Sequence, residues 1–225
     1  MGNSISVKSN KKWIIIGSGY MSEEYIKVCK KLNINVSLIS KNFKKTQYLN
    51  NKYKIETFNS NALDFDFNKF EVIINCVDIS NLYSINKYLL SSRAKYLLTE
   101  KPLAFNQKQI ITLKKISDKN ILLLAYNRRF YESTNLAKKI IMRDGGTRTC
   151  SFQFNERTVD WTSPYSTNGA IENIYPIHSQ SIHLIDLVFY LIGYPINFNT
   201  KKLGKSFKNF YFSGTGVTDQ KCEFT

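Results

Sequence analysis

Residues 17–22 have the types and spacing that bind a phosphate group. They read GSGYMS, a G-x-G-x-x-S sequence in which a small serine replaces a third glycine. Gly17 would permit a tight turn, Gly19 would let the backbone approach a pyrophosphate, and Ser22 would let the next helix pack closely on the sheet. The N-terminus of that helix would present free N–H groups to the anion. We therefore expect a dinucleotide-binding loop rather than a simple turn, with Gly17, Gly19, Tyr20 and Met21 as contacts.

The residues that follow the second expected strand bear on which dinucleotide binds. A carboxylate about 20 residues beyond the glycine loop usually hydrogen-bonds the ribose 2′-hydroxyl. Here the strand ends at Ile39 and is followed by Ser40 and Lys41, with no Asp or Glu before Gln47. A hydroxyl and a lysine suit a 2′-phosphate, which a carboxylate would repel. We expect NADP to be preferred over NAD; the alternative is that these residues only begin a solvated loop.

The elements that must position this loop are short apolar runs alternating with amphipathic segments. Fully apolar runs are typical of parallel strands buried on both faces. The expected strands are residues 13–16, 35–39, 71–77, 96–99 and 121–125, and the expected helices are 21–32, 82–90 and 107–117. The first helix is expected to bury Met21, Tyr25, Val28, Cys29 and Leu32. This alternation predicts an α/β fold, a Rossmann-type doubly wound parallel sheet, as a dinucleotide-binding domain over residues 1–125.

Residues 126–225 have a different pattern, which predicts a second, smaller α+β domain. A helix over 134–142 should end at Asp144, Gly145 and Gly146, and a helix over 182–192 should end at Gly193. Alternating residues over 149–154 and the run 209–212 indicate strands.

Composition and charge limit the possible classes of protein. The chain has 225 residues, of which 43% are hydrophobic, and it contains no apolar run long enough for a membrane span and no apolar leader. Four dispersed cysteines indicate neither a zinc site nor a disulfide framework, which favours a cytoplasmic location. The net charge of +15 would suit nucleic acid, an anionic membrane surface or an anionic substrate. Because the lysines are spread evenly, we expect no nucleic-acid partner.

Four segments, taken in order, resemble the Gfo/Idh/MocA oxidoreductase family. They are IIIGSGYM at 14–21, YLLTEKPLA at 96–104, AYNRRF at 125–130 and SIHLIDLVFYLIG at 181–193. The set resembles most the members found in bacterial surface-polysaccharide gene clusters. The resemblance implies an NAD(P)-dependent oxidoreductase that acts on a hydroxyl or ketone of a sugar or nucleotide sugar.

The resemblance also implies roles for individual residues. Lys101 would hydrogen-bond the substrate oxygen beside the nicotinamide, and His183 would exchange the hydroxyl proton as hydride moves. Histidine suits this task because its ordinary pKa is near 6.5, and the bond before Pro102 is a candidate for a cis peptide. The further cofactor contacts implied are Cys76, Val77, Glu100 and Asn127, and the substrate contacts are Arg128 and Ser179.

Two departures from the family pattern leave alternatives open. Ser179 stands where many members carry an aspartate, and His178 or Asp186 could compensate, although Asp186 could equally be an exposed helix residue. The second domain is shorter than usual, so an open sheet edge would favour a homodimer. A non-catalytic cofactor-binding or scaffolding relative is therefore a second hypothesis, and a basic nucleic-acid or membrane-surface protein is a third.

Overall fold

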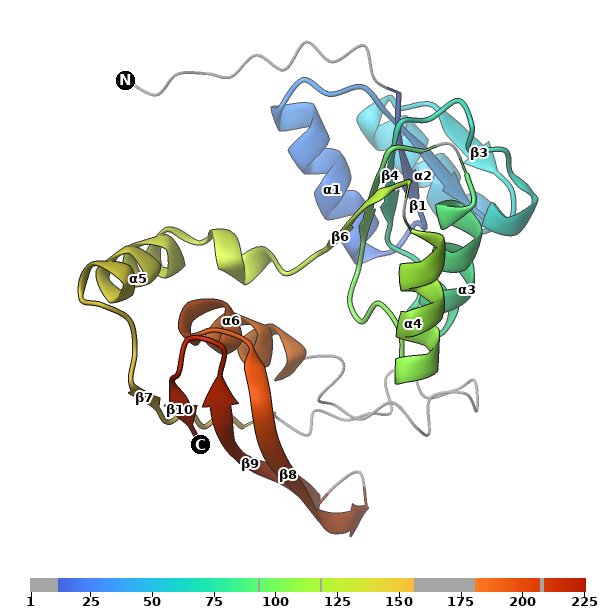
Figure 1. The fold of residues 1–225 in the computed structure, drawn as a ribbon. Coiled ribbons are helices and arrows are strands. Elements are labelled where there is room, and N and C mark those ends of the chain that lie inside the picture. Colours follow the sequence, from blue (N-terminus) through green and yellow to red (C-terminus); the bar gives the residue numbers. More distant parts are fainter. Residues whose placement is uncertain (1–11, 93, 118, 156–180, 207–208) are drawn as a thin grey trace, which may run out of the picture. The chain divides into compact units, whose positions relative to one another are not determined.

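A computed structural model describes residues 12–92, 94–117, 119–155, 181–206 and 209–225 (Figure 1). The chain divides into two compact units, Met1–Ala125 and Tyr126–Thr225. Each unit has its own sheet and its own buried core. The assignment of cofactor binding to one unit and of substrate binding and dimerisation to the other stays a prediction.

The first unit is built on a six-stranded parallel sheet. Its strands are β1 (Trp13–Ile16), β2 (Val36–Ser40), β3 (Thr57–Asn59), β4 (Val72–Asn75), β5 (Tyr96–Thr99) and β6 (Ile121–Leu124). Their order is β3-β2-β1-β4-β5-β6, so β1 pairs on one side with β2 and on the other with β4. This confirms the predicted Rossmann-type sheet. The order reverses between β1 and β4, and in such sheets ligands bind beyond the carboxyl ends of the strands at this point.

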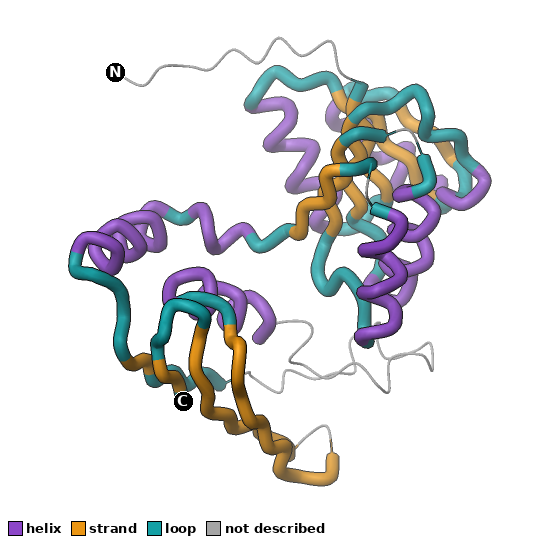
Figure 2. The backbone as a smooth tube through the Cα atoms, viewed as in Figure 1, coloured by secondary structure: helices purple, strands orange, loops and turns teal. Residues whose placement is uncertain are grey.

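Helices cover both faces of this sheet (Figure 2). They are α1 (Tyr20–Lys31), α2 (Phe43–Tyr53), α3 (Ile79–Leu90) and α4 (Gln107–Ile116), with a short 3₁₀ turn, η1 (Ala62–Asp64). Successive strand residues point to opposite faces, so Ile15 packs with α1 and α2 while Ile14 packs with α3 and α4. Because β1 and β4 are buried on both faces, their sequences are almost continuously apolar, whereas β3 and β6 are only partly buried.

The predicted apolar face of α1 is confirmed at Cys29 and Tyr25 and wrong at Val28 and Leu32. Val28 and Leu32 are 51% and 55% exposed, and the residues buried against the sheet are Ser22, Ile26 and Cys29. The small serine lies in the contact face because the helix begins close to the glycine loop. A prediction that considers only apolar residues cannot place a serine such as Ser22 in the buried face of a helix.

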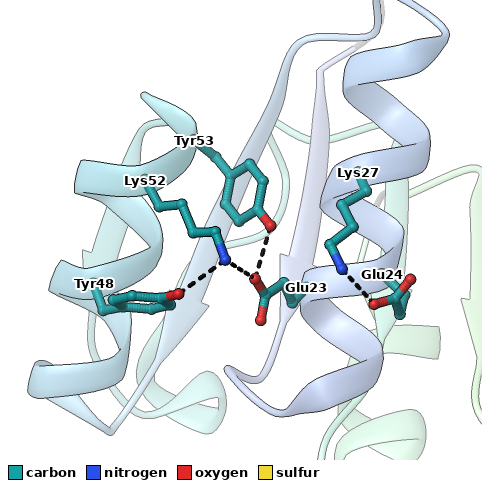
Figure 3. Close-up of polar contacts among 6 residues, drawn as sticks. All are labelled: Glu23, Glu24, Lys27, Tyr48, Lys52 and Tyr53. Carbon is teal, nitrogen blue, oxygen red and sulfur yellow. Dashed lines mark hydrogen bonds and ion pairs between the residues drawn. The ribbon is translucent and has the colours of Figure 1, made fainter.

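The helix α2 and the strand β3 were not expected. Only Thr46 and Leu49 of α2 are buried, so its sequence has almost no apolar stripe. Instead, polar groups join it to α1 (Figure 3): the Glu23 carboxylate accepts hydrogen bonds from Lys52 Nζ at 2.8 Å and from the Tyr53 hydroxyl at 2.7 Å. Lys52 Nζ also donates to the Tyr48 hydroxyl at 2.9 Å.

The second unit contains a four-stranded mixed sheet. Its elements are η2 (Asn127–Phe130), α5 (Glu132–Arg143), β7 (Thr149–Cys150), α6 (Ile182–Ile192), β8 (Pro195–Ser206), β9 (Asn209–Thr218) and β10 (Glu223–Phe224). The strand order is β7-β10-β9-β8. Val188 and Phe189 of α6 pack against buried Cys222 and Phe224. The predicted smaller α+β unit is thereby confirmed.

The predicted helix ends in this unit are confirmed, whereas its strands differ from the prediction. Gly193 follows α6 with φ of +97°, and the Gly146 N–H donates to the Ile141 carbonyl at the end of α5. The ladder of β7 stops at Cys150 instead of residue 154, and β9 is longer than expected. The strand β8 was not expected; its apolar residues Ile196 and Phe198 alternate with asparagines and are exposed.

Candidate functional site

The glycine loop connects β1 to α1 at the carboxyl edge of the parallel sheet. Gly17 has φ of +106°, and its N–H donates to the Ile39 carbonyl of β2 at 2.8 Å. A Cβ at this position would lie 2.7 Å from the Cys76 carbonyl oxygen, which belongs to the backbone. Gly17 is therefore required by the fold itself, because both its backbone angle and the close approach of the chain exclude a side chain.

Gly19 differs, because the fold places no such demand on it. Its φ is −83°, it is the N-cap of α1, and a Cβ there would meet no atom within 4 Å. No side chain caps this helix N-terminus. The open space therefore lies where an anion could meet the first turn of α1.

Ser40 at the end of β2 is brought to the glycine loop. Its hydroxyl shares a hydrogen bond of 2.8 Å with the Ser18 hydroxyl and accepts the Asn42 N–H at 3.2 Å. Asn42 in turn caps α2 by accepting the Lys45 N–H. The structure thus holds Ser40 beside the loop, with Lys41 exposed next to it.

Cys76 and Val77 follow β4, on the other side of the switch point. Burial holds the pKa of the Cys76 thiol well above its ordinary value, so the thiol stays neutral and serves as a small packing group. The end of β4 is fixed by Asn75, whose buried amide donates to Asn86 Oδ1 at 2.8 Å. These residues form a neutral wall beside the glycine loop.

Glu100 and Lys101 follow β5, the next strand of the sheet. The Glu100 N–H donates to the Asn75 carbonyl at 3.0 Å, and the peptide bond between Lys101 and Pro102 is cis, as anticipated. The Tyr25 hydroxyl of α1 donates to Glu100 Oε1 at 3.3 Å. Burial raises the pKa of the Glu100 carboxyl above its ordinary value, although nearby Lys101 opposes that shift. Tyr25 was expected only as an apolar contact, and its hydroxyl was the overlooked signal.

The segment of residues 127–130 forms η2 at the start of the second unit. Asn127 is exposed and Arg128 is half-buried. Arg129 binds Asp186 of α6 through its Nε and Nη2, and the Asp186 side chain is only 9% exposed. Asp186 is therefore not an exposed helix residue, and its carboxylate is occupied by Arg129. His183 lies one turn earlier on α6, with its ring edge-on to that of Tyr126 at 6.1 Å.

The predicted site residues thus fall into two groups. The glycine loop, Ser40, Cys76, Val77, Glu100 and Lys101 belong to the first unit, and the carboxyl edge of one sheet brings them together. Asn127, Arg128 and His183 belong to the second unit. Ser179 and His178 lie outside the described residues.

A hollow of about 510 Å³ lies at the opposite, amino edge of the parallel sheet. Its lining includes Lys12, Lys30, Lys54 and Lys69 together with Glu56. Lys30 is in the last turn of α1 and Lys54 is the C-cap of α2. Because helix C-termini are partly negative, these two lysines complement the helices. Ligands of such sheets bind beyond the carboxyl ends of the strands, so we do not assign the candidate site to this hollow at the amino edge.

Two further searches concern only the described residues. Among them no cluster of His, Cys, Asp and Glu side chains could hold a metal ion. None of the described helices is long and apolar enough to span a membrane.

Comparisons with known proteins give structural matches only. No protein-family model and no curated protein matches the sequence. Among solved structures, the WlbA dehydrogenase of Bordetella pertussis, crystallised with NADH and UDP-GlcNAcA, matches 96% of this chain and 69% of its own at 12% identity, with a TM-score of 0.76. A levoglucosan dehydrogenase in complex with NADH and levoglucosan matches 96% of this chain and 66% of its own at 17% identity, with a TM-score of 0.74.

The myo-inositol 2-dehydrogenase of Lactobacillus plantarum matches 96% of this chain and 68% of its own at 14% identity, with a TM-score of 0.71. The chain thus spans about two thirds of the length of these structures. At such low identity the likeness establishes the fold alone.

Proposed function

We propose that the chain is an NAD(P)-dependent oxidoreductase that moves hydride between a nicotinamide cofactor and a hydroxyl or ketone of a sugar or nucleotide sugar. Surface-polysaccharide biosynthesis is the process we propose for it. The fold it shares with dehydrogenases, two of which were crystallised with NADH and a sugar or sugar nucleotide, supports the reaction class.

The observation that carries the proposal is the geometry at Gly19. The fold would tolerate a side chain there, yet the position leaves open the uncapped N-terminus of α1 at the switch point of the sheet. A pyrophosphate fits this arrangement, because it needs close approach to backbone N–H groups and a partly positive helix end. Ser40, joined to the loop through Ser18, fits the adjoining ribose.

The cofactor contacts proposed beyond the glycine loop come from both units. Those of the first unit lie at the carboxyl edge of its sheet and are Ser40, Lys41, Cys76, Val77, Glu100 and Lys101, and the one from the second unit is Asn127. We propose NADP over NAD because Ser40 and Lys41 stand where a carboxylate would repel a 2′-phosphate.

The reacting groups proposed are Lys101 and His183. When bound, the nicotinamide supplies or accepts hydride. The Lys101 ammonium would donate a hydrogen bond to the substrate oxygen and stabilise negative charge that develops there. The His183 imidazole would take or return the hydroxyl proton. A single reaction requires both residues to act on one substrate oxygen.

The substrate contacts proposed are Arg128 and Ser179. Because Arg129 is bound to Asp186, we assign an anionic substrate group, such as a sugar-nucleotide phosphate, to Arg128. A guanidinium binds such a group with two parallel hydrogen bonds.

A fluorescence titration with NADPH and NADH tests the proposal. The wild-type chain should bind NADPH well below millimolar, and Gly19→Ala should weaken binding at least tenfold while leaving the melting temperature unchanged. Equal binding by wild type and Gly19→Ala would refute the proposal that the glycine loop binds the cofactor. Failure of the wild type to bind either cofactor below millimolar would refute the proposed oxidoreductase function. Tight binding without turnover of any sugar would favour the non-catalytic relative.

A further inference from the structure

We propose that η2 and α6 form a clamp that orients the His183 imidazole, with Tyr126, Arg129 and Asp186 as its positioning residues. This inference rests on the proposed function, because it assumes that His183 is the proton-exchanging group. All four side chains belong to the second unit.

The first contact of the clamp is the ion pair between Arg129 and Asp186. Arg129 Nε donates to Asp186 Oδ2 at 2.7 Å, and Arg129 Nη2 donates to the other carboxylate oxygen. A two-point grip of this kind fixes rotation as well as distance. Because Asp186 follows His183 by three residues on α6, the pair holds η2 against the helix turn that carries His183.

The second contact is aromatic. The Arg129 guanidinium lies over the rings of Tyr126, at 5.5 Å, and Tyr190, at 5.1 Å. The Tyr126 ring in turn meets His183 edge-on, with an interplanar angle of 81°. Two contacts therefore join the same two elements. Tyr126, the N-cap of η2, meets His183 of α6, and Arg129 of η2 binds Asp186 of α6.

The turn η2 is also tied to the helix that follows it, α5. The buried Thr134 hydroxyl of α5 donates to the Arg128 carbonyl at 2.8 Å. Burial raises the pKa of the Tyr126 hydroxyl to about 12, so this ring stays neutral throughout the physiological range. A neutral, packed ring on a turn held to two helices is a rigid support for an imidazole.

The chain offers a control that separates orientation from stability. Lys138 of α5 is also bound to α6: its Nζ donates to the Tyr190 carbonyl at 3.1 Å and lies 3.5 Å from the centre of the Tyr190 ring. Lys138→Met would loosen α6 at Tyr190, whose ring Arg129 also contacts, while it leaves the Arg129–Asp186 pair and the Tyr126 ring in place.

The first measurement is the imidazole C–H spectrum of the full chain by NMR. The sequence has two histidines, so His178→Gln assigns the His183 signals. Arg129→Lys keeps the charge but loses the two-point grip, and Tyr126→Leu removes the ring. Both changes, and Asp186→Asn, should shift the His183 signals, whereas Lys138→Met should leave them in place.

The second measurement separates kcat from KM during cofactor-dependent turnover. Asp186→Asn and Arg129→Lys should lower kcat at least tenfold and change the KM for the cofactor less than twofold, at a loss of melting temperature similar to that of Lys138→Met. His183 signals that do not move in any clamp variant, or a kcat loss no greater than that of Lys138→Met, would overturn the inference. A wild type without turnover would refute the proposed function, and the NMR comparison would still decide whether the clamp orients His183.

Discussion

At the scale of single residues, Glu100 is the carboxyl whose environment makes the clearest prediction. Its pKa is raised by burial, so the folded chain holds this proton to a higher pH than the unfolded chain does. Near pH 4 both states hold the proton. As pH rises, the unfolded chain releases it first, and the free energy of unfolding therefore falls until pH passes the raised pKa.

Glu100→Gln removes this pH dependence and can still accept the hydrogen bond from Tyr25. We expect the melting temperatures of the variant and the wild type to coincide near pH 4, and the variant to melt a few degrees higher at pH 8. Thermal unfolding followed by circular dichroism at both pH values measures the difference. If the melting temperatures of variant and wild type differ by the same amount at both pH values, the pKa of Glu100 in the folded chain is not raised.

The second residue-scale prediction concerns Ser40 and Lys41. One charge-assisted contact to a 2′-phosphate contributes about 1.5–3 kcal/mol, which is roughly a ten- to hundredfold preference. Ser40→Asp combined with Lys41→Ala should remove the preference for NADPH over NADH, and added salt should weaken the wild-type preference because Lys41 is exposed. The ratio of the two dissociation constants checks this. An unmoved ratio would mean that these residues do not contact the 2′ position.

Residue types alone predicted the parts of the candidate site that lie within short motifs, and missed those that join distant segments. The loop at Gly17 and the cis bond before Pro102 follow from local sequence. The pair of Arg129 and Asp186 is 57 residues apart, and Tyr25 and Glu100 are 75 apart. Such pairs form only when distant elements become neighbours in the fold, and the spacing of residues within one segment does not predict which elements will do so.

At the scale of elements, the junction between β1 and α1 predicts opposite consequences for two neighbouring glycines. Gly17→Ala would combine a positive φ with a Cβ 2.7 Å from a backbone oxygen. We expect it to lower the free energy of unfolding by about 2 kcal/mol or more, and the melting temperature by roughly 4–8 °C. Gly19→Ala, which meets nothing, is the matched control for this stability measurement. Equal melting temperatures would contradict the packing described at Gly17.

Elements were predictable from sequence where burial was two-sided. Strands such as β1 and β4 contribute side chains to both faces of the sheet, so their apolar runs are unbroken. The helix α2 is attached through Glu23, Lys52 and Tyr53 (Figure 3), and polar attachment leaves no apolar period to find. The strand β8 pairs with β9 through its backbone, and its alternation of Ile196 and Phe198 with asparagines is a strand signal that the prediction did not use.

At the scale of the whole molecule, the excess of positive charge has a structural use. Basic residues occupy the last turns of α1, α2, α3 and α4, where they complement the partly negative helix ends. Charge distributed over helix ends differs from the basic stripe that nucleic-acid binding requires. The net charge therefore does not by itself support the nucleic-acid hypothesis.

The division into two units, each with its own core, predicts two unfolding steps for the full chain. The first unit buries two large clusters, whereas the described core of the second contains three buried residues, Ile192, Cys222 and Phe224. We expect the second unit to melt first. NADPH at 100 times its dissociation constant should stabilise the unit that binds it by about 2.7 kcal/mol.

Calorimetry with and without NADPH tests this, and fluorescence identifies which unit each step belongs to. The two tryptophans are Trp13 in the first unit and Trp161 in the second, so Trp161→Phe leaves emission from the first unit alone. We expect Trp13 emission to change at the upper transition. NADPH should raise the temperature of that transition by roughly 5–10 °C, as follows from the stabilisation of about 2.7 kcal/mol and the size of the unit. A single calorimetric transition that coincides with the change in Trp13 emission would show that the two units unfold as one. Two transitions of which only the lower responds to NADPH would place cofactor binding outside the unit that contains Gly19 and Ser40.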